Sequence, residues 1–112
     1  MAYNQELANR VQSAFQLFPT EITNALTQKK MFGGLSFLFH GKMTVGIVKE
    51  DLAVRVVSDK MKEVLQQDAV RPMDFTKRPM KEFIYVSPQG FETEEQLNHW
   101  IELGVEHAKS KL

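Results

Sequence analysis

The sequence predicts an α+β domain in which a single antiparallel β-sheet, built as a meander, carries helices on one face. Three observations predict this class. Apolar residues recur with helical spacing near both ends of the chain. In the middle of the chain they alternate with the period of two that a strand requires. Glycine and proline fall between these segments, where turns are expected. The resulting order is helix, strands, helix, strand, helix.

The first predicted helix covers residues 4–17. Three apolar residues repeat at intervals of four, which places them on one helical face: Leu7, Val11 and Phe15. Asn4 is a suitable N-cap because its side chain can accept from the free amides of the first turn. Pro19 is expected to stop this helix. Residues 20–27 are expected to hold a second, short helical turn.

Three strands of a meander follow. Each places its apolar residues at alternate positions, on one face: Leu35, Phe37 and Phe39, then Met43, Val45 and Ile47, then Leu52, Val54 and Val56. Residues 40–41 and 49–51 are expected to form the reversals, and Gly41 supplies the positive φ that a tight hairpin turn demands. Residues 29–32 are expected to form a further strand or its start, ended by the glycine pair at 33–34.

The second half of the chain returns to helical spacing. Ser58 is expected to cap a helix over about residues 59–67, whose inward residues are Met61, Val64 and Leu65. Residues 71–80 contain two prolines, which favour an extended loop over a helix. Residues 83–86 are a further strand, and residues 88–90 a turn.

The last helix begins at a capping box formed by Thr93 and Gln96 and runs to about Lys109. Its apolar stripe contains Leu97, Trp100, Ile101 and Ala108. Gly104 lies on the same stripe, which indicates close packing against a neighbouring element.

Length and composition limit the possible functions. The 112 residues form one expected domain, 1–112. The absence of cysteine excludes disulfides, thiolate zinc sites, iron–sulfur clusters and cysteine nucleophiles. The 14 basic and 14 acidic residues cancel, which argues against a dedicated non-specific nucleic-acid binder. No signal sequence or membrane-length apolar stretch is visible, so we expect a cytoplasmic protein without a membrane partner.

No catalytic or metal-binding arrangement is predicted. His99 and His107 lie two helical turns apart, too far to chelate one ion directly. No serine has the context of a nucleophile motif. The acidic pairs at 50–51 and 94–95 have structural explanations, in a turn and in a helix first turn. We therefore expect no catalytic residue, no cofactor, no metal ion and no enzymatic activity.

Charge is distributed unevenly along the chain. Residues 28–42 contain three basic residues and no acid, and residues 70–81 carry four basic residues and one acid. Residues 92–106 contain five acids and no lysine or arginine. One interpretation is solvated faces, and the other is a basic patch for an anion, a nucleic acid or an acidic partner. Arg55 lies on the second face of the predicted sheet, where we expect it to be exposed, or an anchor if that face binds a partner.

An ordered series of motifs carries a family resemblance: Lys30–Phe37, Gly41–Met43, Asp51–Val56, Arg71–Phe75, Arg78–Met80 and Phe83–Val86. Together they resemble the N-terminal domain of the TfoX/Sxy family, bacterial regulators of competence, over about residues 5–108. The resemblance implies a fold like the type III secretion chaperone-like domains, a homodimer, and neither cofactor nor catalytic residues. Full-length competence regulators carry a second, C-terminal domain, so a stand-alone N-terminal domain is expected here.

The leading functional hypothesis is a non-catalytic regulatory module that binds another protein. The candidate interaction surface combines the two basic segments with Arg55 and adjacent glycines and apolar residues: Lys29, Lys30, Phe32, Gly33, Gly34, Arg55, Arg71, Met73, Lys77, Arg78, Met80 and Lys81. A nucleic-acid-associated transcriptional regulator is the alternative, and it is not favoured because the chain is neutral. A small-molecule-binding domain is the third hypothesis, which a cavity of several hundred Å³ with converging polar groups would support.

Overall fold

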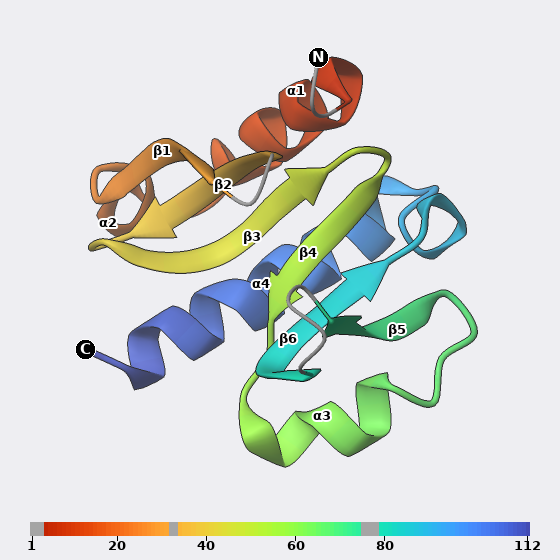
Figure 1. Cartoon of the computed structure of the whole chain (residues 1–112). Coiled ribbons are helices and arrows are strands. Elements are labelled where there is room, and N and C mark those ends of the chain that lie inside the picture. Colours follow the sequence, from red (N-terminus) through yellow and green to blue (C-terminus); the bar gives the residue numbers. More distant parts are fainter. Residues whose placement is uncertain (1–3, 32–33, 75–78) are drawn as a thin grey trace.

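A computed structural model describes residues 4–31, 34–74 and 79–112. The elements run in the order α1 (Gln5–Phe15), α2 (Thr20–Thr23), β1 (Leu26–Met31), β2 (Gly34–Phe39), β3 (Lys42–Val48), β4 (Asp51–Arg55), α3 (Ser58–Val64), β5 (Val70–Asp74), β6 (Pro79–Val86), the 3₁₀ turn η1 (Pro88–Gly90) and α4 (Glu94–Ser110). The strands form one six-stranded sheet in the order β1-β2-β3-β4-β6-β5, and every neighbouring pair is antiparallel (Figure 1). The predicted α+β class is confirmed.

The helices share one face of the sheet. Figure 1 shows α4 passing behind β3 and β4, with α1 near one end of the sheet and α3 near the other. One core joins this face to all four helices. Its largest fully buried side chains come from α1, α4 and the four inner strands: Phe15, Phe37, Phe39, Ile47, Leu52, Ile84, Leu97, Trp100 and Ile101.

Helix α1 begins as its sequence predicts. The Asn4 side chain accepts a hydrogen bond of 3.0 Å from the Leu7 amide, which satisfies one of the free donors of the first turn. The helix ends at Phe15, before Pro19, and Pro19 then precedes α2. The short second helix is confirmed only to residue 23, because Leu26 already belongs to β1.

Strand β3 contains one extra residue, Thr44, in a β-bulge. Phe37 of β2 pairs with Val45, but the next pair along β2 joins Leu38 to Met43. The prediction that Met43 shares the core face with Val45 is therefore wrong, because one extra residue sends the preceding side chain to the opposite face. The Thr44 hydroxyl is buried and donates to the Phe37 carbonyl oxygen at 2.8 Å.

Gly104 lets α4 approach β3 at this bulge. A Cβ atom at residue 104 would lie 2.4 Å from the Thr44 carbonyl oxygen, closer than any carbon can approach. The close packing predicted from the position of Gly104 is confirmed. The capping box is confirmed as well: Gln96 and Thr93 exchange hydrogen bonds of 3.0 and 3.1 Å between side chain and backbone.

Helix α3 differs from its prediction at both ends. Ser58 is its first residue rather than its cap, which is Val57. The Ser58 hydroxyl instead donates to Glu82 Oε2 at 3.0 Å. The helix ends at Val64, and Leu65, expected to face inward, is exposed.

The loop predicted over residues 71–80 is wrong for its described parts. Residues 70–74 form β5, and β6 begins at Pro79. Both prolines occupy positions that strands tolerate, since Pro72 lies in an edge strand and Pro79 is the first residue of its strand.

Candidate functional site

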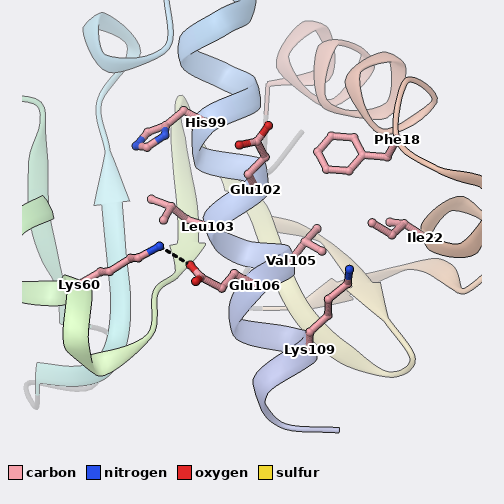
Figure 2. A pocket seen from close by; sticks show the side chains of 9 residues that line it. All are labelled: Phe18, Ile22, Lys60, His99, Glu102, Leu103, Val105, Glu106 and Lys109. Carbon is pink, nitrogen blue, oxygen red and sulfur yellow. Dashed lines mark hydrogen bonds and ion pairs between the residues drawn. The ribbon is translucent and has the colours of Figure 1, made fainter.

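A groove of about 490 Å³ runs along the side of α4 that faces away from the sheet (Figure 2). Its apolar lining comes from α4, α2 and the turn before α2: Phe18, Ile22, Leu103 and Val105. Figure 2 shows Val105 on the flank of α4 toward Phe18 and Ile22, and Leu103 on the flank toward α3. Phe18 is half-buried and the other three residues are buried, so the apolar lining presents a small exposed surface, mainly at Phe18.

Charged side chains surround this apolar lining. Lys60 of α3 and Glu106 of α4 form an ion pair of 2.7 Å across the groove. Glu102 and Lys109 also line it, and neither forms an ion pair or side-chain hydrogen bond with another described residue. They are separated by about 10 Å along the helix, from the rise of 1.5 Å per residue. The groove therefore offers one free acid and one free base on either side of an apolar slot.

A second polar site lies where the end of β4 meets the last turns of α4. Glu82 Oε1 is 3.4 Å from His107 Nε2, 3.6 Å from Lys111 Nζ and 3.9 Å from Arg55 Nη2. Its other oxygen accepts from Ser58, and Arg55 Nη2 lies 3.1 Å from His107 Nε2. One carboxylate thus connects β4, α3, β6 and the C-terminal part of α4. We call these five residues the Glu82 cluster.

The environment shifts the protonation equilibria of the Glu82 cluster. The Ser58 hydrogen bond, assisted by His107 and Lys111, lowers the pKa of Glu82 to about 2. Burial lowers the pKa of His107, and the positive charge of Arg55 lowers it further. His107 Nε2 faces both Arg55 Nη2 and Glu82 Oε1, so it accepts from the guanidinium in one tautomer and donates to the carboxylate in the other. The other ring nitrogen, Nδ1, is buried and has no hydrogen-bond partner among the described residues.

The Glu82 cluster has the contacts of a structural link and lacks those of a catalytic site. The Ser58 hydroxyl is bonded to Glu82 and not to His107, so no base is placed to activate it as a nucleophile. A carboxylate with a pKa of about 2 is a poor general base. His107 is only 2% exposed, which leaves a substrate no access to the imidazole.

Arg55 corrects one sequence prediction. Exposure was expected, but only 25% of its side chain is accessible, and its guanidinium lies 4.2 Å from the Phe83 ring centroid. The β3–β4 ladder ends at the pair Val45–Val54, so Arg55 has no partner on β3 and can reach α4. No local pattern in the sequence identifies Glu82 as the partner of Arg55. Glu82 has φ +63°, and its position near Arg55 depends on the pairing of β6 with β4, which exists only in the folded chain.

A smaller polar cluster surrounds Arg71, an exposed residue of β5. Arg71 forms an ion pair with Asp51, donates to Ser87 Oγ at 3.1 Å and lies 4.9 Å from the Tyr85 ring centroid. The directly paired residues Arg71, Tyr85 and Ala53 share the sheet face opposite α4.

The structure separates the two basic segments instead of joining them. Lys29 and Lys30 are exposed on β1, whereas Arg71 is on β5, at the other edge of the sheet. Five inter-strand spacings place these edges about 24 Å apart. Gly34 is buried in β2, where a Cβ would collide with the Ile47 carbonyl oxygen.

The remaining predicted residues have the following places. Met73 lies in β5, and Met80 and Lys81 lie in β6. Phe32, Gly33, Lys77 and Arg78 lie outside the described residues. Within the described ranges, no group of three or more histidine or acidic side chains could hold a metal ion. No helix in the described part of the chain combines the length and apolarity needed to cross a membrane.

The fold and these sites define a small α+β domain whose polar clusters hold its elements together and whose groove is open to contact. The family model of the TfoX N-terminal domain matches residues 20–108, from α2 almost to the end of α4. Because this match covers most of the chain, the protein belongs to the TfoX N-terminal domain family, a family of competence-related, non-enzymatic regulatory domains. A comparison with curated proteins finds no match.

Proposed function

We propose that this chain is a non-catalytic regulatory module that acts by binding another protein through the groove along α4. The observation that carries the proposal is the combination of an apolar lining with two charges, Glu102 and Lys109, that have no partner within the described chain. Interfaces place apolar side chains in such pockets and use surrounding charges to select the partner. Family membership supports the regulatory part of the proposal.

The groove specifies what the partner presents. An apolar side chain of the partner contacts Phe18, the half-buried member of the lining, and removes its exposed carbon atoms from water. A basic group then lies near Glu102 and an acidic group near Lys109. This order of charges gives the complex one orientation, because the reverse docking brings like charges together.

Site-specific photo-crosslinking in the native host tests the proposal. A photoreactive amino acid is placed at Glu102 or Lys109 in the groove, and at Lys62, which is exposed on α3 outside it, as the matched control. We expect both groove positions to give an adduct of the same mass with one protein, and Lys62 to give none. Adducts of unrelated masses, or an equal yield at Lys62, would contradict the proposal.

A small molecule is a second candidate occupant, because the groove volume of about 490 Å³ falls within the range of ligand sites. Native mass spectrometry of protein purified gently from its host distinguishes the candidates. A few hundred daltons of extra mass identifies a small ligand, and a larger increment a protein or a nucleic acid. A doubled mass supports the homodimer, which we retain as part of the proposal.

A further inference from the structure

We propose that the free edge of β1 binds an extended acidic segment of the partner protein, which joins the sheet as a seventh strand. This inference rests on the proposed function and adds the chemistry of the partner and a second contact surface. Strand addition of this kind uses main-chain hydrogen bonds for affinity and alternate side chains for specificity.

The register of β1 determines which main-chain groups point outward. The Ala25 carbonyl oxygen accepts from the His40 amide at 3.1 Å, and β1 then pairs with β2 without interruption. In an antiparallel ladder, hydrogen-bonded and non-bonded pairs alternate. The N–H and C=O groups of Leu26, Gln28 and Lys30 therefore point away from β2. None of them has a hydrogen-bond partner in the described part of the chain.

The other edge of the sheet is closed to the same kind of pairing. The Ser87 amide donates to the Ala69 carbonyl oxygen at 2.8 Å, so Val70 and Pro72 are the outward-facing residues of β5. The Val70 amide already donates to the Gln67 carbonyl oxygen at 3.1 Å. Pro72 has no N–H to offer. Strand addition is thus blocked at β5 and open at β1.

Space is also available beside β1. Gln28 and Lys30 pair with Phe37 and Leu35, so their side chains are on the face that carries the helices. Both are nevertheless exposed, as are Thr27 and Lys29 on the opposite face. The side chains of residues 27–30 are therefore open to solvent on both faces of the sheet, as an added strand requires.

The charge of β1 selects an acidic partner. Lys29 and Lys30 project to opposite faces, and neither forms an ion pair with a described residue. Lysines on an edge strand oppose pairing with apolar or basic strands. Pairing with a second copy would add two more lysines to the same strand pair, where residues 26–31 contain no acid. A strand with glutamate or aspartate side chains supplies the missing opposite charges.

The test uses fluorescence polarisation with two labelled ten-residue peptides, one alternating threonine with glutamate and one alternating threonine with lysine. Gln28→Pro removes the central outward N–H of β1 and leaves its bonds to β2 intact, as Pro72 does at β5. Gln28→Ala is the matched control that keeps the N–H. We expect the glutamate peptide alone to bind, Gln28→Pro to weaken it about tenfold or more, and Gln28→Ala to have little effect.

If Gln28→Pro fails to fold, amide hydrogen exchange of the wild-type chain, measured with and without the peptide, tests the same contact. The glutamate peptide should slow amide exchange at Leu26, Gln28 and Lys30 and leave Val70 unchanged. Charge reversal at Lys29 and Lys30 to glutamate should transfer binding to the lysine peptide. Equal binding of both peptides, or equal affinity of the proline and alanine variants, would overturn the inference.

The two proposals fail separately. A partner captured from Glu102 and Lys109, without slowed exchange at β1 when that partner is added, overturns strand addition and leaves the proposed function standing. A doubled mass that Gln28→Pro abolishes identifies a second copy as the occupant and overturns the acidic partner.

Discussion

Glu82 connects more parts of the molecule than any other single residue of its cluster. It has φ +63°, a conformation that costs a non-glycine residue about 1–2 kcal/mol. Its carboxylate meets His107, Lys111, Arg55 and Ser58 from three other elements, and these contacts offset the strain. This backbone conformation directs the carboxylate between β4 and α4, where it contacts Arg55 and His107.

Replacing Glu82 by glutamine should lower the free energy of unfolding by about 1–3 kcal/mol, because the half-buried Arg55 loses its counter-charge while the backbone strain remains. Urea denaturation measures the change. Glu63→Gln, on the exposed side of α3, is the control and should stay within about 0.5 kcal/mol of wild type. Equal effects of the two substitutions would show that the Glu82 contacts contribute nothing.

Protonation of His107 should destabilise the fold in mild acid. Its pKa in the folded state lies below the ordinary value of 6.5, so the unfolded chain takes up the proton first. Stability is therefore unaffected above pH 6.5 and falls as the pH drops below it. Glu82 adds a further loss only between pH 4.5 and about 2, where its folded and unfolded pKa values differ.

Thermal unfolding at pH 7.5 and pH 5.5 checks the prediction for His107. The wild-type chain should melt at a lower temperature at pH 5.5, and His107→Gln should show a smaller difference between the two conditions. His99→Gln, which alters an exposed histidine, should retain the full difference. A wild-type melting temperature that is the same at both pH values would contradict this account.

At the scale of elements, the contact between α4 and β3 holds the helical layer on the sheet. Gly104 meets the Thr44 carbonyl oxygen at the bulge, so helix and strand are in backbone contact there. The β3–β4 ladder ends beside the bulge, at the pair Val45–Val54, and Arg55 follows this last pair and reaches His107.

Gly104→Ala should destabilise the protein by about 1–3 kcal/mol, because the new methyl group forces α4 away from β3. This outcome is opposite to the gain of about 1 kcal/mol that alanine gives over glycine in an unconstrained helix. Differential scanning calorimetry measures the shift, with Glu102→Ala on the exposed side of α4 as the control. A melting temperature raised by Gly104→Ala would show that the close contact is absent.

The sequence predicts those elements whose signals are local. Each of three signals, the cap of α1, the cap of α4 and the alternation in β2, spans only a few residues. Each could therefore be identified without the rest of the fold. The bulge at Thr44 depends on β2, and β5 depends on pairing with β6, so neither has a local signal. The groove and the Glu82 cluster combine residues from distant segments, which only the folded chain brings together.

At the scale of the whole molecule, a net charge of zero conceals an uneven distribution of charge. The free lysines of β1 lie on one edge of the sheet, whereas the groove beside α4 has its own free acid and base. A partner that contacts both the β1 edge and the groove would bind in a single position and orientation.

Reversing the charge of Glu102 to lysine should reduce capture of the partner by about three- to tenfold, the range expected for losing one charge pair and adding a repulsive one. Stability should not change, because Glu102 has no ion pair to lose within the described chain. Crosslinking yield from position 109 measures the effect, and Lys62→Glu is the matched control outside the groove. Undiminished capture by Glu102→Lys would remove the groove from the contact surface.

Pro72 has a consequence for how many chains can join one another. A sheet with two receptive edges can grow without limit, since each added strand presents a fresh edge for the next. Here the β5 edge lacks a free outward N–H at residues 70 and 72, so the proposed addition at β1 should give a complex of fixed stoichiometry. Because Pro72 removes one of these donors, it should also oppose the growth of fibres from an open strand.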